Sequence, residues 1–350
     1  MPEKVIKVYR DGSKYEGEVD NTKRHGCGLY VWPNGDLYNG DWVNGIMHGS
    51  GMMRWIDGSC YSGEWEHGYP CGIGRKTMKD GTVHSGEWKE GKASGYGSKR
   101  YPEGDRYFGE YLGDKRHGEG RYFWPNGDEY DGMWAEGEMH GQGTKRMRDG
   151  SVYSGEWQHG MACGQGTKNF VDGSKHTGCY KDDHRHGYGV YTWPKGDHYK
   201  GDWVMGDQEG FGTYFYIEDG ATYKGMWLKG QKHGVGVSSR PRPKSATWEL
   251  EVQCWDHGKL TKSILVKEGL RLDIFAEGSH STELFDEPEQ SDEKPSEIKT
   301  KCCVCLVADI DHVLVPCGHA CVCARCAYTL RDDKCPVCRR FFTHRQKLYF

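Results

Sequence analysis

The chain has 350 residues, a formal net charge of −4, 52 glycines and an aromatic content of 13%. Glycine at about twice its usual share, with many Trp, Tyr and Phe residues, predicts short strands joined by turns rather than one large α/β core. The small negative charge argues against a strongly basic nucleic-acid-binding protein. No stretch of about 18 apolar residues is present, so we expect no membrane-spanning helix.

The N-terminus and the cysteines indicate the compartment. The first residues, MPEKVIKVYRDG, contain no apolar signal region, so we expect a protein that is not secreted. The 15 cysteines are odd in number, and nine lie in the last 50 residues. This pattern predicts a reducing compartment and metal binding instead of disulfides. We therefore expect a cytoplasmic protein, with a peripheral place at a membrane or the cytoskeleton as an open alternative.

The first two thirds of the chain contain a repeat of 23 residues. Each unit starts with tyrosine or histidine, has glycine two positions later, and has Trp, Tyr or Val after two more. The first residues of the ten units are Tyr15, Tyr38, Tyr61, His84, Tyr107, Tyr130, Tyr153, His176, Tyr199 and Tyr223. A second motif, HGxG, recurs at His25, His48, His117, His140, His186 and His233. The two-residue spacing predicts one strand face on which aromatic rings lie across a glycine.

Each unit is therefore predicted to form one β-hairpin. The HGxG segment supplies the second strand, and NG, DG and EG pairs supply the turns. No unit can bury its rings alone, so we expect an all-β, elongated ribbon of stacked hairpins that neighbouring units stabilise. Residues 248–260 are expected to form a degenerate cap, in which Trp248 replaces the tyrosine and the glycine is lost. An atypical end unit would blunt the exposed edge.

The YxGxW and HGxG motifs at this period resemble the MORN repeat family, over roughly residues 9–237. That resemblance implies protein scaffolding, dimerisation or binding to anionic lipid. Residues 1–260 carry a net charge of about −3, which suits an acidic membrane surface poorly. We therefore favour a protein substrate as the partner of the ribbon and keep an acidic lipid as the weaker candidate.

Two features of the repeat allow more than one interpretation. WPNGD at 32–36 recurs at 124–128, and His84 recurs at His176, both at an offset of 92 residues. Duplication of a four-unit block explains the offset, and a functional surface presented twice is the alternative. The HGxG histidine is replaced by Ser94 in one unit. Because a metal ligand does not tolerate serine, we interpret these histidines as structural.

The composition changes after the repeats. Residues 261–275 carry the apolar pattern of a short helix or strand. Residues 276–300 contain eight acids, two lysines and two prolines, which predicts disorder. We therefore divide the chain into a ribbon of ten clear units plus the cap at 9–260, a linker at 261–300, and a tail domain at 301–350.

The tail domain contains four pairs of metal-binding side chains. They are Cys302 with Cys305, Cys317 with His319, Cys323 with Cys326, and Cys335 with Cys338. Thiolates and imidazole at these short spacings suit tetrahedral Zn²⁺, and eight ligands predict two closed, structural sites. A domain of about 50 residues has little core, so the two zinc ions would supply its folding energy. Cys303 and Cys321 are left over, although Cys303 could in principle shift the register.

Histidine in fourth place resembles a RING finger, a small zinc-stabilised α+β domain. PCGHxxxCxxC at 316–326 and CPxCR at 335–339 resemble the RING fingers of inhibitor-of-apoptosis-type ubiquitin ligases. The resemblance implies interleaved ligands, with the first and third pairs on one ion and the second and fourth on the other.

The same resemblance implies a RING-type E3 ubiquitin transferase, an aminoacyltransferase that forms no covalent enzyme intermediate and works by positioning a charged ubiquitin-conjugating enzyme. Val304, Leu330 and Pro336 match the apolar docking positions, and Arg339 matches the arginine that bridges ubiquitin and the conjugating enzyme. The ribbon would then select or localise substrates. The alternative is a non-enzymatic scaffold or membrane-tethering protein whose RING serves assembly.

The last twelve residues carry five large apolar groups: Phe341, Phe342, Leu348, Tyr349 and Phe350. Such groups favour burial. In ligases that this tail resembles, a C-terminal strand packs against a partner RING, and an aromatic residue eleven positions after the last ligand contacts ubiquitin on the other subunit. Tyr349 holds that position, so we expect a homodimer. The alternative is a tail that folds back on its own RING.

Overall fold

The structure, a computed structural model, describes five stretches of the chain: residues 3–242, 248–266, 312–315, 319–322 and 344–347. Every element in these stretches is a β-strand, which confirms the predicted all-β ribbon of hairpins. The helical part expected of a RING lies outside the described residues. Within them, no helix is long and apolar enough to cross a membrane. The chain divides into two units, residues 1–194 and 195–350.

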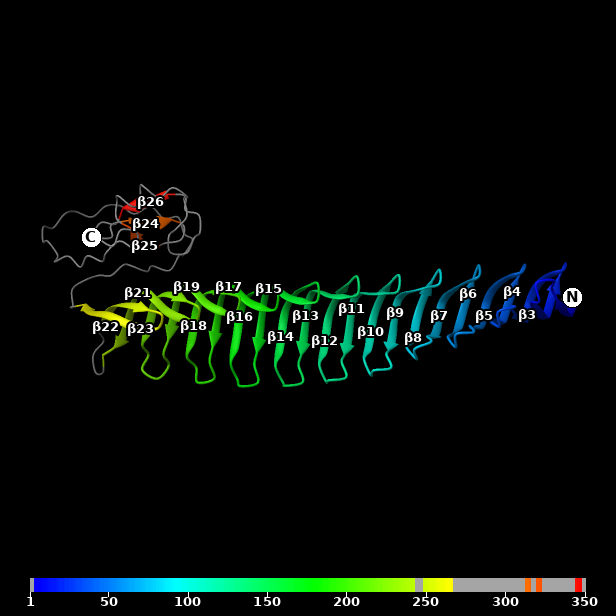
Figure 1. Ribbon diagram of the computed structural model, residues 1–350, viewed down its shortest axis with the longest axis horizontal. Helices are drawn as coiled ribbons and strands as arrows, with labels where there is room; N and C mark the ends of the chain where they lie inside the picture. Colours follow the sequence, from blue (N-terminus) through cyan, green and yellow to red (C-terminus); the bar gives the residue numbers. More distant parts are fainter. Residues whose placement is uncertain (1–2, 243–247, 267–311, 316–318, 323–343, 348–350) are drawn as a thin grey trace. The chain divides into compact units, whose positions relative to one another are not determined.

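In the first unit the strands follow one another in chain order, each antiparallel to the next (Figure 1). Shorter strands carry the Tyr-x-Gly-x-Trp pattern and alternate with nine-residue strands that carry HGxG. The strands are β1 (Glu3–Val8), β2 (Lys14–Asp20), β3 (Lys23–Val31), β4 (Leu37–Val43), β5 (Ile46–Arg54), β6 (Cys60–Glu66), β7 (Tyr69–Thr77), β8 (Val83–Lys89), β9 (Lys92–Arg100), β10 (Arg106–Leu112), β11 (Lys115–Phe123), β12 (Glu129–Ala135), β13 (Glu138–Arg146), β14 (Val152–Gln158), β15 (Met161–Asn169), β16 (Lys175–Lys181) and β17 (His184–Thr192).

The second unit repeats this alternation. Its strands up to residue 266 are β18 (His198–Val204), β19 (Asp207–Phe215), β20 (Thr222–Leu228), β21 (Gln231–Pro241), β22 (Trp248–Asp256) and β23 (Lys259–Val266). β23 passes residue 260, where the ribbon was expected to end, because its residues pair with β22 as far as Val266. At the other end of the chain, β1 precedes the expected start at residue 9 because it pairs with β2 from Lys14 to Val19.

The end unit differs from its expected alignment. Gly234 pairs with Trp255 as Gly210 pairs with Trp227, so Trp255 holds the motif tryptophan position. Trp248 was expected to replace the tyrosine, but it lies at the start of β22 and is 53% exposed. By the same register, a buried glutamine, Gln253, takes the glycine position. Its side chain accepts a hydrogen bond from Trp255 Nε1 at 3.2 Å.

The HGxG motif forms a β-bulge. In the β12–β13 hairpin the register shifts directly after the pair Gly132 and Gly143. The first glycine of the motif, Gly141, has φ +61°, a left-handed backbone that favours glycine. The bulge withdraws the Met133 carbonyl from regular pairing, and Tyr130 Oη donates a hydrogen bond to it at 3.0 Å.

The second glycine of HGxG makes room for the tyrosine ring. A Cβ atom built on Gly143 would lie 2.5 Å from Tyr130 Cζ and 2.6 Å from Cε2. Gly132, on the facing strand, is equally crowded, because its Cβ would lie 2.8 Å from Tyr130 Oη. The ring therefore covers two paired glycines and is fully buried. The prediction that rings lie across strand glycines is confirmed.

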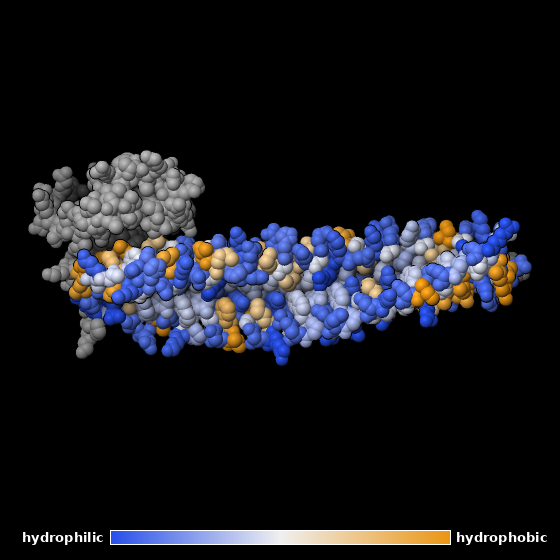
Figure 2. All heavy atoms as spheres, viewed as in Figure 1, coloured by the Kyte–Doolittle hydropathy of each residue, from blue (hydrophilic) through white to orange (hydrophobic). Residues whose placement is uncertain are grey.

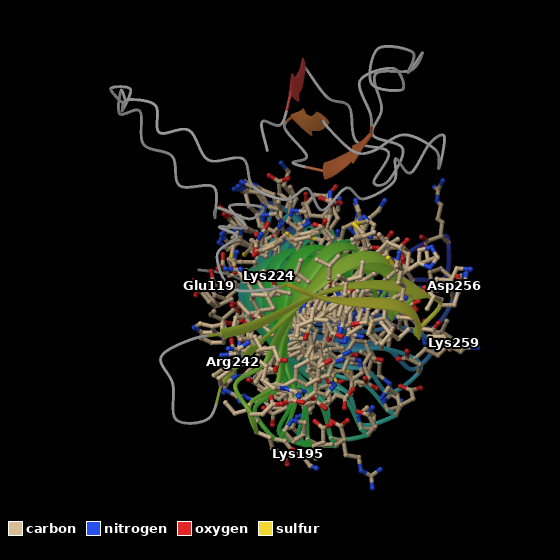
Figure 3. The ribbon with its side chains drawn as sticks, turned by 90° about the vertical axis from the view of Figure 1, so that its left-hand side faces the viewer. Glu119, Lys195, Lys224, Arg242, Asp256 and Lys259 are labelled. Carbon is tan, nitrogen blue, oxygen red and sulfur yellow. The ribbon has the colours of Figure 1, made fainter. Side chains whose placement is uncertain are left out.

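The tryptophans join one unit to the next. Trp134 Nε1 donates to the Gly120 carbonyl of the preceding unit at 3.0 Å, and Trp157 Nε1 donates to Gly143 at 3.1 Å. The Tyr130 ring meets Trp134 and Trp157 edge to face, with centroids 5.3 Å apart in both pairs. Figure 3 shows side chains gathered inside the curve of the strands, while the charged residues it labels, such as Glu119 and Lys259, lie at the outside.

Two histidines interrupt the buried tyrosines. His84 and His176 take the tyrosine position and are 2% and 0% exposed. Burial lowers the pKa of each to about 4, so both are neutral at pH 7. In the first unit the aromatic core falls into one cluster from Tyr15 to Trp88 and a second from Ala93 to Tyr180. His84 and His176, which are 92 residues apart, therefore lie at corresponding places, each near the C-terminal end of one cluster.

Alanine at Gly143 is expected to destabilise the ribbon by about 2–3 kcal/mol, because the new methyl group overlaps the Tyr130 ring. Gly137→Ala is the matched control. Gly137 has φ +91° and nothing within 4 Å of its Cβ position, so only backbone strain of about 1 kcal/mol is expected. Thermal unfolding of the full chain, followed by circular dichroism, measures both losses. Equal losses would contradict the steric argument.

Acid is expected to destabilise the ribbon through His84 and His176. In the unfolded chain these histidines are protonated below their ordinary pKa of 6.5. In the folded chain they stay neutral until the pH falls to about 4. The unfolded state therefore binds more protons in this window, and stability falls as the pH falls, by about 3 kcal/mol for each histidine.

The matched variant is His84→Tyr with His176→Tyr, since tyrosine is the residue of the other units. Urea unfolding at about pH 7 and pH 4.5 should show a smaller loss for this variant than for the natural chain. Identical pH dependence would refute the role of the two histidines.

Candidate functional site

Three short strands form the described part of the C-terminal region. β24 (His312–Val315) lies between β25 (His319–Val322) and β26 (His344–Lys347), and both pair with it in antiparallel fashion. The tail strand β26 therefore pairs within its own chain, which is the alternative to packing against a partner. With both edges of β24 occupied, a second copy of the chain cannot add a strand there.

One predicted zinc ligand falls in a described stretch. His319 begins β25, and its backbone lies opposite Leu314 of β24. The other predicted site residues lie outside the described residues and stay predictions: Cys302, Val304, Cys305, Cys317, Cys323, Cys326, Leu330, Cys335, Pro336, Cys338, Arg339 and Tyr349. The predicted disorder from residue 276 and the leftover Cys303 also lie outside, whereas the other leftover cysteine, Cys321, lies in β25.

The predicted donor set fits zinc by its chemistry. Seven thiols and one imidazole are the ligand types that closed structural zinc sites use. Bound zinc would supply folding free energy to a domain with little core. The number of ions, two, rests on the eight-ligand count and remains a prediction.

Histidines meet in pairs at the turns of the repeats. Most of these turns dock on the preceding unit through the N–H of their glycine: Gly258 N–H, for example, donates to the Lys232 carbonyl at 2.9 Å. Where the residue before the turn glycine is histidine, its ring lies beside an HGxG histidine. The ring centroids are 6.1 Å apart for His48 and His67, 6.5 Å for His140 and His159, and 4.8 Å for His233 and His257.

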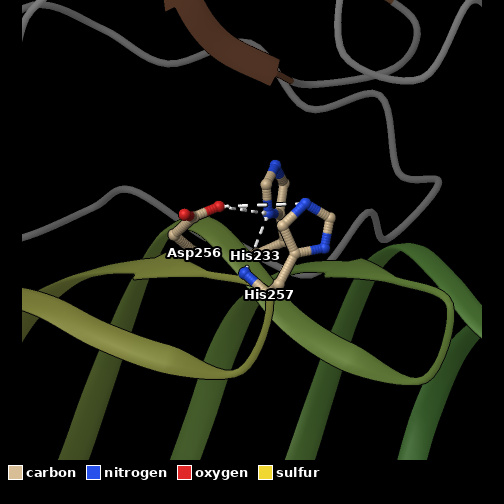
Figure 4. A group of neighbouring side chains, drawn as sticks. All are labelled: His233, Asp256 and His257. Carbon is tan, nitrogen blue, oxygen red and sulfur yellow. Dashed lines mark hydrogen bonds and ion pairs between the residues drawn. The ribbon is translucent and has the colours of Figure 1, made fainter.

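At one of these pairs a carboxylate lies close to both histidines. Asp256 Oδ1 lies 3.8 Å from His233 Nδ1 and 3.8 Å from His257 Nε2 (Figure 4). The sequence interpretation missed this cluster, because it treated every HGxG histidine as structural and did not pair it with the turn of the following unit. The sequence signal that could have found it is DHG one repeat after HGxG.

Three candidate nucleophiles of the ribbon have shifted pKa values, and Lys232 is enclosed by aromatic rings. Lys232 Nζ lies 4.2 Å from the Tyr223 ring centroid and 4.5 Å from that of Trp255. Burial lowers its pKa to about 8, while the rings hold the cation in place. Burial raises the pKa of the Cys71 and Cys163 thiols, which makes them less reactive.

Both parts of the chain match known families. MORN repeats match residues 15–37, 38–60, 61–83, 84–106, 107–129, 130–152, 153–175, 176–198, 199–217 and 223–241. A zinc finger of the C3HC4 type, the RING finger, matches residues 298–345.

Curated relatives share a short part of the chain. The apoptosis inhibitor IAP of Cydia pomonella granulosis virus is 40% identical over 65 residues, which is 18% of this chain and 23% of the relative. The E3 ubiquitin-protein ligase SP1 of Arabidopsis thaliana is 34% identical over 82 residues, 23% of each protein. The E3 ubiquitin-protein ligase MGRN1 of Mus musculus is 42% identical over 55 residues, 15% of this chain and 10% of the relative. The chain thus spans less than a quarter of these relatives.

Among solved structures, the TCP domain of Drosophila melanogaster SAS-4, in complex with a proline-rich motif of Ana2, covers 51% of this chain and 90% of its own. The sequence identity is 13% and the TM-score is 0.30. A likeness this weak carries no argument about function.

The MORN matches span more than half of the chain, and the described strands show the Tyr-over-glycine hairpins that the repeat motif requires. The chain belongs to the MORN-repeat family and carries, in addition, a zinc-binding RING finger of the C3HC4 type.

Proposed function

We propose that the chain is a RING-type ubiquitin-protein ligase whose ribbon selects or localises the substrate. The observation that carries this proposal is the RING match at 298–345 with its full set of eight zinc-type donors. Relatives that bear ubiquitin-ligase names support it. The RING would bind a ubiquitin-conjugating enzyme charged with ubiquitin, and the transfer would go directly to a substrate lysine.

Such a ligase works by positioning, so its residues need only hold the charged enzyme in a reactive pose. Val304, Leu330 and Pro336 would form the apolar docking face, which a small and transient interface needs at its centre. Arg339 would donate hydrogen bonds to ubiquitin and to the conjugating enzyme at once. None of these groups forms a covalent bond with ubiquitin.

Val304→Glu and Leu330→Glu are each expected to lower autoubiquitylation roughly 100-fold or more, since a carboxylate at an apolar docking face costs several kcal/mol. Arg339→Ala should slow transfer more than it weakens docking. Cys303→Ser, beside Val304 but outside the predicted ligand set, is the control and should retain activity. The assay uses the full chain and a panel of conjugating enzymes. Full activity in all three variants, with zinc still bound, would favour the scaffold alternative.

The same assay tests the proposed homodimer. β26 pairs through one edge with β24 of its own chain, and we propose that Tyr349, which follows β26, acts on the partner subunit. Tyr349→Ala should lose most activity. A mixture of Tyr349→Ala chains with Val304→Glu chains should regain one working site if Tyr349 acts across the dimer. No recovery would place its action within one chain.

The surface of the first unit supports a protein partner for the ribbon. Ile73 and Tyr96 each lie at the bulge, between the two glycines of a motif in which Cys71 or Ser94 replaces the HGxG histidine, and they are 62% and 61% exposed. Glu87 lies between them, since it pairs with Ile73 and accepts the Tyr96 backbone N–H at 3.0 Å. Apolar groups beside a carboxylate suit protein recognition better than an acidic lipid surface. On the face in Figure 2, apolar residues form small groups among hydrophilic ones.

Ile73→Asp with Tyr96→Asp is expected to spare autoubiquitylation and reduce ubiquitylation of cellular substrates at least tenfold, because it removes apolar contacts at the proposed face. Val171→Asp is the control, since Val171 is 70% exposed but lies outside this face. Quantitative mass spectrometry of ubiquitylated peptides from cells compares the three chains. We expect the protein in the cytoplasm. An unchanged set of substrates would remove Ile73 and Tyr96 from the recognition surface.

A further inference from the structure

A turn of the last described hairpin of the repeats brings three metal-binding side chains together. His257 occupies the β22–β23 turn with φ +42°, Asp256 ends β22, and His233 lies at the start of β21. Their ligand atoms lie within 4.8 Å of one another. Figure 4 shows the three side chains converging above the strands, and all three belong to the second unit.

The distances between the donor atoms approach those of a tetrahedral metal site. Zinc bonds of about 2.0–2.1 Å place neighbouring donor atoms about 3.3 Å apart. The two distances to Asp256 Oδ1 are 3.8 Å, so small rotations of exposed side chains would close the site. The side chains of His233, Asp256 and His257 are 37%, 68% and 64% exposed, which leaves them room to move.

In this structure His233 Nδ1 is a hydrogen-bond acceptor, so its lone pair is available to a metal ion. The backbone N–H of His257 donates to His233 Nδ1 at a long 3.4 Å, so this nitrogen acts as the acceptor. A metal ion would replace that long hydrogen bond with a ligand bond. Two imidazoles and one carboxylate form an open set of three zinc ligands, with a fourth position for water.

The other histidine pairs lack this arrangement. At the pair His140 and His159, the residue that corresponds to Asp256 is Gln158. Glu138 Oε2 lies 3.1 Å from His159 Nδ1, but this carboxylate and the two histidines do not form a group of three donors within 4.8 Å. At the pair His48 and His67 a glutamate holds that place, but the rings are 6.1 Å apart. Among the residues that the structure describes, His233, Asp256 and His257 form the one group of three such donors at this spacing.

We propose that His233, Asp256 and His257 bind a divalent transition-metal ion of the zinc class, outside the RING and independently of ligase activity. The ion ties the β22–β23 turn to β21. The alternative is that the cluster binds no metal and that Asp256 only forms ion pairs with the two histidines.

Each histidine substitution for the test introduces the residue that another repeat of this chain has at the equivalent position. His233→Ser places at the HGxG position the residue found at Ser94. His257→Asn places in the turn the residue found at Asn44, whose φ is +52°. Each change therefore removes an imidazole and keeps the local backbone. His140→Ser with His159→Asn is the matched control pair.

The full chain is dialysed against buffers of fixed free zinc in the micromolar range, where the RING is already loaded, and metal per chain is measured by elemental mass spectrometry. The natural chain and the control pair should bind one zinc ion more than His233→Ser with His257→Asn. Asp256→Asn should weaken this uptake at least tenfold. Circular dichroism confirms that every variant is folded. Equal zinc content in all chains would overturn the proposal.

A second measurement uses one molecule as its own control. Diethyl pyrocarbonate modifies accessible imidazoles, and peptide mass spectrometry reports the modified residues. Added zinc should protect His233 and His257 at least fivefold and leave His140 and His159 reactive. Protection of neither pair, or equal protection of both, would show that the ion-pair arrangement has no metal function.

Discussion

The contact on which the ribbon depends is a tyrosine ring lying over two glycines that face each other across a hairpin. Gly132 and Gly143 have no side chains, so the Tyr130 ring can pack directly on the backbone. The bulge that HGxG creates frees a carbonyl, and the tyrosine hydroxyl binds it. The ring then presents its faces and edges to Trp134 and Trp157. Ring, glycines and bulge are therefore one structural unit, and a change to any of them disturbs the others.

This constraint also explains where the sequence is free to vary. The residue between the HGxG glycines and the residue before the turn glycine both point outward, because the bulge and the turn need only the backbone of their glycines. Isoleucine, tyrosine, glutamate and glutamine occur at the first of these positions, and asparagine, histidine and methionine at the second. Both positions are therefore available for recognition or metal chemistry, whereas the interior is committed to packing.

The period of 23 residues was sufficient to predict the hairpins, their turns and the burial of the rings, because each of these follows from local spacing. It could not predict which side chains of different units meet. Trp248 was assigned to the tyrosine position because it begins the last segment, whereas the strand pairing shows that Trp255 continues the tryptophan row. His233 and His257 stand in separate repeats, and only the docking of a turn on the preceding unit brings them together. For the RING, the ligand spacing predicts zinc, and the resemblance to RING fingers implies a ligase. The described strands add that the tail strand β26 pairs with its own chain.

The two parts of the protein derive their stability from different sources. The ribbon buries aromatic rings, so its free energy of unfolding depends on packing and on keeping His84 and His176 neutral. The RING region has few residues with which to build a core, so metal ligation must replace burial there. Acid acts on both, because protonation uncouples thiolates and imidazoles from zinc and also charges the buried histidines. A chelator acts on the RING and spares the aromatic interior of the ribbon, which contains no metal-dependent contact among the described residues. Loss of zinc should therefore remove the proposed transfer function first, while the ribbon keeps its fold and its outward-facing positions.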